Sequence, residues 1–597
     1  MTAVVAARPR WSSRRVLALG GRPIPSDRSG VTGATWLWFA LSLVFAAWCG
    51  VGGLRQAFAH PYVVQDDARQ YLFWMERFFD PELFPHDLMA DYFSSVTPPA
   101  YIALHRVAAV VFGIDPFLLN KLLPIILGLI TAACTFMLSM RLLPVPAAAF
   151  AATTILTESL WLSDAIPSGT ERAFVYPLFL AFLSWLIGRR YGLSLLAMVL
   201  LGLFYPPMLA VALGTVCLSL IGRGEGQWCL ARDRRLYLLL AGAVVASAVI
   251  VGWSSYISAR WGPIVTAEQA RSMREFTYAG RTFFFTADPW KFWYWGERSG
   301  VAPYGVRPPL LWIGLLLPVL ARFPSTFPLI RQLSPATSLL TRVVIASLGL
   351  YLTAHALIFR LYLPNRYTEH SLRIVFSIAA GIVLLAVLDT LWRWLLEPGD
   401  ARCRVRTAAL AASGVAALAV IVLYPVVLWY SRVPFPKTQY FVGGEEGLYR
   451  YLERQPKDIL VASLSTEGDL LPSFAKRSVL TGYEFGRPFH PLYYHEIERR
   501  TDDLFRAQYS FDPWEVRAFI EKYGITYWLV DQKAFTRQYV MTSIWIQQTQ
   551  PQAARVAASL ERPTLPVVAQ LSLRCQAYSG RTVILLNAAC LKSLAQD

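Results

Sequence analysis

Residues 63–71 read VVQDDARQY and place two adjacent carboxylates, Asp66 and Asp67, shortly after the first long apolar run. Charge this close to a hydrocarbon boundary costs free energy and is usually retained for function. Adjacent like charges also repel, and within the stretch only Arg69 offsets them. We therefore predict that Asp66 and Asp67 activate a hydroxyl group or hold a metal ion.

The composition is that of a membrane protein. The 597 residues are 55% hydrophobic and only 16% charged, whereas soluble proteins are about 25% charged. The net charge of +17 comes mostly from arginines in short loops between apolar runs, as expected of cytoplasmic loops. No basic stripe with interleaved aromatic residues lies in a soluble part, so we expect no nucleic-acid partner.

The apolar runs predict an α-helical polytopic domain over residues 33–432 with about eleven crossings. The expected spans are Gly33–Leu54, Phe117–Met140, Val145–Leu162, Arg172–Ile187, Leu193–Tyr205, Met208–Ile221, Leu236–Ile257, Pro308–Leu320, Leu340–Phe359, Ser371–Leu395 and Ala408–Tyr430. Tyr101–Gly113 is expected to be interfacial or re-entrant. The motif Ala57-Phe58-Ala59 is similar to a signal-peptide cleavage site, but the first run is long enough for a retained anchor.

Charge predicts the topology. The basic leader, residues 1–32, and the arginine-rich loops are expected in the cytoplasm. The loops 55–100, 163–171, 258–307 and 360–370 are then extracytoplasmic. This assignment treats Pro206-Pro207 as a break between two short spans. If residues 193–221 formed one span, Tyr101–Gly113 would become a full crossing and Arg189-Arg190 would lie outside.

Residues 433–597 contain no run long enough to span a membrane and predict an extracytoplasmic α/β domain. Helices are expected at 447–454, 470–475 and 513–523, and strands at 458–464, 478–481, 525–531 and 582–586. Cys575 and Cys590 lie in this domain and are able to pair if it is exported.

The external loops carry further candidate residues. The first is expected to form an amphipathic helix along the membrane surface, in which His86, Asp87 and Asp91 either support the acidic pair or cap the loop. The aromatic third loop is expected to form an interfacial belt, or in part a groove for a sugar or lipid tail.

The short second loop contains Asp164, Glu171 and Arg172, which form either a structural ion pair or a site for metal or phosphate. In the fourth loop, Arg366 and Arg373 suit phosphate binding, because arginine binds phosphate bidentately and stays charged when partly buried.

Together these features resemble the GT-C class of membrane glycosyltransferases, which includes protein O-mannosyltransferases, aminoarabinose–lipid A transferases and oligosaccharyltransferase catalytic subunits. The resemblance rests on the single first span, on the external loop that opens with Gln65-Asp66-Asp67, on the late loop 363–367 (LPNRY) and on the C-terminal α/β domain.

The resemblance implies a multi-pass protein of the plasma membrane that transfers a sugar from a polyprenyl-phosphate or polyprenyl-pyrophosphate donor to a glycan, lipid or protein of the envelope. Asp66 or Asp67 would be the catalytic base. The donor phosphate would be held by Arg172, Arg366, His370 and Arg373.

A divalent cation, Mg²⁺ or Mn²⁺, on Asp67 and Glu171 remains open. Two other functions also remain open: a transporter or flippase of a lipid-linked glycan, and a scaffold with this architecture but no catalysis. The candidates for a transport pathway are His105, Lys121, Glu158 and His355.

Overall fold

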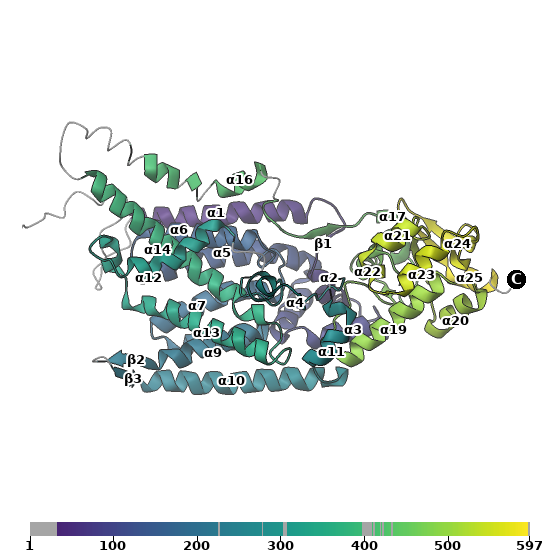
Figure 1. Ribbon diagram of the computed structural model, residues 1–597, viewed down its shortest axis with the longest axis horizontal. Helices are drawn as coiled ribbons and strands as arrows, with labels where there is room; N and C mark the ends of the chain where they lie inside the picture. Colours follow the sequence, from purple (N-terminus) through teal and green to yellow (C-terminus); the bar gives the residue numbers. More distant parts are fainter. Residues whose placement is uncertain are drawn as a thin grey trace, which may run out of the picture.

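The computed structural model describes residues 33–224, 227–277, 279–302, 307–396, 409, 412–417, 419–420, 423–430 and 434–594. The molecule is elongated, with a bundle of apolar helices at one end and an α/β lobe at the other (Figure 1). The predicted basic leader and parts of the last predicted span lie outside the described residues.

The bundle and its external loops are built mostly from helices. Their bounds are α1 Gly33–Ala57, α2 Ala68–Leu72, η1 Phe73–Phe78, α3 Leu88–Val96, α4 Pro99–Phe112, α5 Pro116–Leu142, α6 Pro146–Trp161, η2 Glu171–Phe174, α7 Val175–Ile187, α8 Tyr191–Phe204, α9 Pro206–Ser219, α10 Arg234–Ser258, α11 Ala267–Ser272, η6 Pro309–Leu316, α12 Leu317–Leu320, α13 Ser338–Ala356, η9 Pro364–Tyr367, α14 Glu369–Leu396 and α16 Tyr424–Tyr430. Two strands, β2 Ile221–Gly224 and β3 Gln227–Leu230, form an antiparallel hairpin at the end of the bundle farthest from the α/β lobe (Figure 1).

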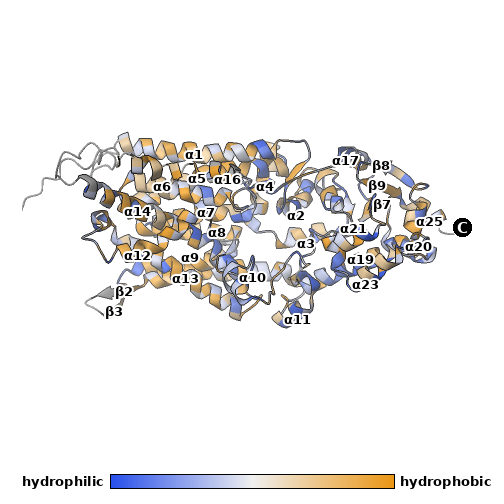
Figure 2. Ribbon diagram, turned by 45° about the horizontal axis from the view of Figure 1, so that its top comes forward, coloured by the Kyte–Doolittle hydropathy of each residue, from blue (hydrophilic) through white to orange (hydrophobic). Residues whose placement is uncertain are grey.

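Five helical segments of the described residues are long and apolar enough to cross a membrane: Gly33–Ala57, Pro116–Leu142, Arg234–Trp261, Pro335–Ala356 and Pro364–Trp394. Four shorter apolar helices accompany them, and hydrophobic residues dominate this end of the molecule (Figure 2). The chain is therefore a helical membrane protein, while the count of eleven crossings stays a prediction. The expected break at Pro206-Pro207 is present, because α8 and α9 are separate helices that pack against each other.

The first external loop differs from the single amphipathic surface helix that we expected. It folds into a short strand, β1 Val63–Gln65, followed by the short helices α2, η1 and α3. The strand pairs antiparallel with β4 Tyr440–Val442. Aromatic side chains of the loop are buried against the C-terminal lobe: Phe73 packs on Phe485, and Tyr92 stacks on Tyr493 with ring centroids 3.6 Å apart. Burial against protein explains the helical spacing that suggested a membrane surface.

The C-terminal lobe contains a five-stranded sheet in the order β6-β5-β7-β9-β8. Strands β5, β6 and β7 are parallel, and β8 and β9 form the antiparallel hairpin. The bounds are α17 Glu446–Glu453, β5 Leu460–Ser463, α18 Leu471–Phe474, β6 Ser478–Val479, α19 Pro491–Gln508, α20 Pro513–Tyr523, β7 Tyr527–Asp531, α21 Arg537–Thr542, α22 Ile544–Gln547, α23 Gln552–Ser559, α24 Val567–Leu571, β8 Gln576–Ser579, β9 Val583–Asn587 and α25 Ala588–Leu594. Each predicted strand and helix of this region has a counterpart, and the long helix α19 is an addition.

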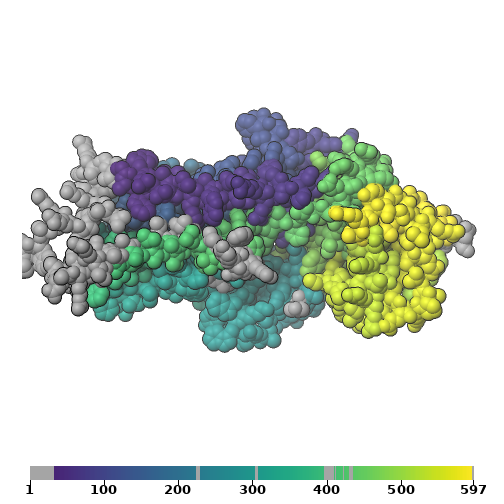
Figure 3. Space-filling view, turned by 90° about the horizontal axis from the view of Figure 1, so that it is seen from above, coloured from purple at the N-terminus to yellow at the C-terminus, as the bar shows by residue number. Residues whose placement is uncertain are grey.

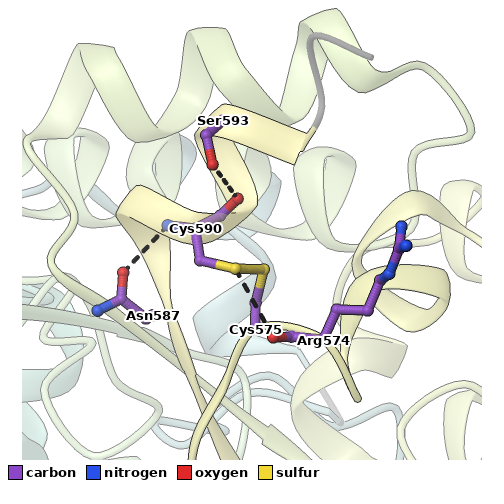
Figure 4. The surroundings of a disulfide bond; sticks show 5 residues. All are labelled: Arg574, Cys575, Asn587, Cys590 and Ser593. Carbon is purple, nitrogen blue, oxygen red and sulfur yellow. Dashed lines mark hydrogen bonds between the residues drawn. A yellow bond between two sulfur atoms is a disulfide. The ribbon is translucent and has the colours of Figure 1, made fainter.

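Cys575 and Cys590 form a disulfide that joins the start of β8 to α25 (Figure 4). The side-chain oxygen of Asn587 accepts a hydrogen bond from the backbone N–H of Cys590, which fixes the first turn of the helix. Disulfides persist in oxidising compartments, whereas the export of the lobe stays a prediction.

The lobe packs closely on the bundle (Figure 3). One continuous cluster of buried apolar residues runs from the membrane helices through the first external loop into the sheet. A second cluster joins the aromatic third loop to the lobe through Phe276, Phe359 and Phe489. Part of that loop is therefore interior, whereas Trp290, which is 67% exposed, remains a candidate for the interfacial belt.

Candidate active site

The acidic pair is held in place by the β1–β4 pairing. Asp66 follows β1 directly, and its backbone N–H donates to the carbonyl oxygen of Gln439, the residue before β4, at 3.1 Å. The segment that leads into the C-terminal lobe therefore fixes the backbone of the first external loop. Both carboxylates keep some access to solvent, since the side chains of Asp66 and Asp67 are 23% and 21% exposed.

Asp67 faces arginines from three different segments. Its Oδ2 atom lies 2.5 Å from Nη2 of Arg172, in the second external loop. Its Oδ1 atom lies 3.8 Å from Arg281, in the third loop, and 3.9 Å from Arg487, in the C-terminal lobe. Arg172 also forms an ion pair with Asp164. The first two external loops are thus joined through one guanidinium group.

The surrounding charge keeps Asp67 ionised. Burial by itself raises the pKa of this carboxyl, but four guanidinium groups outweigh burial and hold the pKa below its ordinary value. In order of decreasing effect, they belong to Arg172, Arg487, Arg281 and Arg366. The charge of Arg366 has the smallest effect of the four.

Asp66 belongs to a network of ion pairs that extends into the C-terminal lobe. It forms an ion pair with Arg69 and lies 3.8 Å from Arg281. Both arginines also pair with Glu484, whose side chain is only 1% exposed, and Arg69 lies 2.8 Å from it. Gln70 donates a further hydrogen bond to Glu484. Glu484 is therefore one of the residues through which the lobe holds the first external loop.

The late arginine loop is anchored by a carboxylate. Glu369, at the start of α14, lies 3.1 Å from Arg366 and 3.8 Å from Arg373. Arg373 also donates to the hydroxyl groups of Ser163 at 2.9 Å and Tyr176 at 3.1 Å. Because an arginine has five N–H donors, these contacts fix its position and leave donors for a ligand.

His370 follows Glu369 at the start of α14. It is fully buried, and its Nδ1 atom lies 2.8 Å from the hydroxyl group of Tyr176. Tyr176 in turn holds Arg373. His370 therefore contacts the residue that holds Arg373, and its role as a phosphate ligand stays a prediction.

A cavity of about 180 Å³ lies between the end of α6 and the start of α14. Asp164, Glu369 and Arg373 line it, together with two further cationic residues, Arg307 and Lys437. Its apolar wall consists of Leu162, Leu372 and Phe376. A cavity lined by both cationic and apolar side chains suits a ligand that is both anionic and lipidic.

The remaining predicted residues have diverse positions. Glu171 is buried beside Asp67, and burial raises the pKa of its carboxyl to about 7. Asp87 caps α3 by accepting hydrogen bonds from the backbone of residues 89 and 90. Asp91 pairs with Arg77 at 3.2 Å, and His86 is exposed. The capping alternative therefore suits the geometry of these loop residues better than a role beside the acidic pair.

The sequence analysis did not predict several residues of the site: Arg281, Glu484 and Arg487 around the acidic pair, and Arg307, Glu369 and Lys437 at the cavity. Arg281 stands next to a run of aromatic residues that indicated a membrane interface. Glu484 and Arg487 lie in the segment between β6 and α19 of the lobe, and no local pattern marks them. Only the docking of the lobe brings them to the acidic pair.

No protein-family model and no curated protein matches this sequence. Solved structures do match. An archaeal oligosaccharyltransferase, AglB from Archaeoglobus fulgidus in complex with an inhibitory peptide and a dolichol-phosphate, overlaps with a TM-score of 0.52 at 13% identity. The match covers 87% of this chain and 72% of that one.

The chain has the fold of the GT-C membrane glycosyltransferases. The resemblance predicted from the sequence is thus confirmed. Another neighbour with the GT-C fold is the arabinofuranosyltransferase AftD from Mycobacteria, with a TM-score of 0.45, 14% identity, and coverage of 84% of this chain and 35% of that one. A further structure of the archaeal enzyme, in complex with Zn and sulfate, overlaps with a TM-score of 0.45 at 14% identity and covers 86% of this chain and 70% of that one.

Proposed function

We propose that this GT-C protein is a glycosyltransferase of the plasma membrane. It transfers a sugar from a polyprenyl-phosphate or polyprenyl-pyrophosphate donor to a glycan, lipid or protein on the outer face. The observation that supports this most is a cavity lined by Arg373, Arg307 and Lys437 together with apolar side chains, to which the ion pairs of Arg172 with Asp67 and Asp164 connect the acidic pair. The dolichol-phosphate bound to the archaeal neighbour is consistent with such a donor.

In this proposal the cavity binds the donor phosphate. Arg373 provides the main contact, and Arg307 and Lys437 add positive charge at the same wall. The isoprenoid chain lies along Leu162, Leu372 and Phe376. Arg366 stabilises the charge that develops on the departing phosphate.

Asp67 is the base of the reaction. The acceptor hydroxyl oxygen attacks the anomeric carbon and forms the new glycosidic bond, while the bond from that carbon to the phosphate oxygen breaks. The bonding electrons leave with the phosphate, and the hydroxyl proton passes to Asp67. We choose Asp67 over Asp66, because Arg172 links Asp67 to the wall of the cavity, whereas Asp66 is engaged by Arg69 and the Glu484 network.

The pH dependence of the reaction should reveal this base. The arginines hold the pKa of Asp67 low in the free protein, so acid should reduce kcat/KM only at low pH. A bound donor phosphate neutralises part of that positive charge, which raises the pKa and makes Asp67 a stronger base. We expect the acid limb of the kcat profile to lie at higher pH than that of kcat/KM. Coincident limbs, or a kcat limb at lower pH, would contradict this coupling.

Replacing Arg373 with glutamine should weaken donor binding. A hydrogen bond to a charged group contributes about 1.5–3 kcal/mol, so KM for the donor should rise about 10- to 100-fold. Arg360→Gln is the matched control, because Arg360 belongs to the same loop but is exposed. If both substitutions raised the donor KM equally, the loss of a positive charge, and not the position of Arg373, would explain the effect.

The orientation can be tested with thiol reagents. The exposed Cys229 lies in the β2–β3 hairpin, and Trp514 is 71% exposed at the opposite end, in the lobe. A membrane-impermeant maleimide added to intact cells should label Trp514→Cys in a Cys229→Ser background but not the native Cys229. Labelling of the native Cys229 but not of Trp514→Cys would place the lobe in the cytoplasm and contradict the proposed site on the outer face.

The function itself can be tested on protein reconstituted with a lipid extract of its host membrane. We expect the wild type to consume a polyprenyl-linked sugar and to glycosylate an envelope fraction, and the Asp66→Asn, Asp67→Asn double variant to do neither. Movement of an intact lipid-linked sugar across the bilayer would indicate a transporter. Equal amounts of glycosylation with both proteins would remove the enzyme proposal.

A further inference from the structure

Asp67 and Glu171, the pair considered for a divalent cation, do not have the surroundings that such an ion requires. Both oxygens of Asp67 face guanidinium groups, at 2.5 Å from Arg172 and at 3.8 and 3.9 Å from Arg281 and Arg487. A dication at this carboxylate would lie among three positive charges. Within the ranges that the structure describes, no group of three His, Cys, Asp or Glu side chains is placed to hold a metal ion.

A nitrogen atom already lies where a bridging cation would be. Nη2 of Arg172 contacts Oδ2 of Asp67 at 2.5 Å and forms an ion pair with Oδ2 of Asp164. Two carboxylates from separate external loops therefore meet at one positively charged atom. Each contact is a charge-assisted ion pair of the kind that arginine forms with carboxylates.

We propose that the guanidinium group of Arg172 takes the place of a divalent cation between Asp67 and Asp164, so that this protein orients its base without a metal. The inference rests on the proposed function, because it concerns the same carboxylate. Arg172 acts through Asp67 and is a positioning residue. Its Nε atom also lies 3.4 Å from the hydroxyl group of Ser168, which fixes the plane of the guanidinium group.

This arrangement gives the site a permanent bridging charge. Arginine remains protonated under all physiological conditions, so the bridge does not depend on the supply of a metal. The bridge also sets the distance from Asp67 to the cavity, because Asp164 lines the cavity wall. The carboxylate that accepts the proton is thereby tied to the wall against which the donor phosphate binds.

Binding of Mn²⁺ alone, measured by electron paramagnetic resonance on the full-length protein in nanodiscs, tests the inference without any assay of activity. We expect the wild type to bind no more Mn²⁺ than its Asp67→Asn variant. Arg172→Gln should bind Mn²⁺ at least about tenfold more tightly than the wild type, because a positive charge is removed from between two carboxylates. Adding Asp164→Asn to Arg172→Gln should abolish the gain.

Arg172→Lys is the conservative control. It keeps a positive charge, so it should resemble the wild type in Mn²⁺ binding and retain more sugar transfer than Arg172→Gln. Transfer by the wild type should also be unchanged by a chelator. One Mn²⁺ per wild-type molecule that is lost in Asp67→Asn, or a chelator-sensitive transfer that Mn²⁺ restores, would overturn the inference. An absence of Mn²⁺ binding by a folded Arg172→Gln protein would also overturn it, whereas absence of transfer altogether would refute only the proposed function.

Discussion

Replacing Asp67 with asparagine is expected to lower sugar transfer about 10²- to 10⁴-fold, the range by which a positioned base accelerates a reaction. Asparagine has nearly the same shape but accepts no proton at neutral pH. The side-chain oxygen of the asparagine still accepts a hydrogen bond from Arg172, which also keeps its partner Asp164, so the loops should stay joined. The loss should therefore appear in kcat, with little change in the donor KM, in the reconstituted transfer assay.

Two other carboxylates of the same loop provide controls. Asp91→Asn should leave kcat unchanged, because Asp91 pairs with Arg77 away from the cavity. Asp66→Asn should affect thermal stability more than kcat, because Asp66 is part of the network around Glu484. Transfer at the wild-type rate by Asp67→Asn would show that another group is the base. A larger loss of kcat with Asp66→Asn would reassign the role within the pair.

The second large effect is expected from Glu484→Ala. Glu484 is buried between Arg69 and Arg281, which would both lose their partner. Removing one member of a buried ion pair costs about 3–5 kcal/mol, because the remaining charge stays desolvated. We expect a marked drop in the Tm of the lobe, a weaker attachment of the lobe to the first external loop and loss of transfer. Limited proteolysis and thermal unfolding in nanodiscs would measure the first two effects.

Glu521→Ala is the matched control for this variant. Glu521 also pairs with two cationic residues, Arg517 and Lys592, but on the surface of the lobe, where water competes for the charges. Its loss should change the Tm little. If the two variants unfolded at the same temperature, the Glu484 network would not be what joins the lobe to the catalytic loop.

Several parts of the site were predictable from the sequence, because their signals are local. The pair Asp66-Asp67 follows a long apolar run, and Arg366 and Arg373 flank the start of another. Membrane helices and positive-inside loops depend on hydropathy and charge over short windows. The strands of the lobe were predictable for the same reason, since each is a short apolar run between turn signals.

The remainder depends on contacts between distant segments. The aromatic residues of the first loop have helical spacing, which suggested a helix on a membrane surface. In the structure the loop pairs with β4, and its aromatic residues are buried against the C-terminal lobe. Likewise, Arg281 and Arg487 become site residues only when the third loop and the lobe dock on Asp67. Nothing in a local window indicates which of the 56 lysines and arginines of the chain approaches a given carboxylate.

The most direct test of the central claim is native mass spectrometry of the protein purified with its bound lipids. The account predicts that Asp67→Asn retains a polyprenyl-phosphate that still carries its sugar. The same lipid should be absent when Arg366 and Arg373 are both replaced by glutamine. Absence of any isoprenoid phosphate from the Asp67→Asn protein, or its retention by the double arginine variant, would contradict the account.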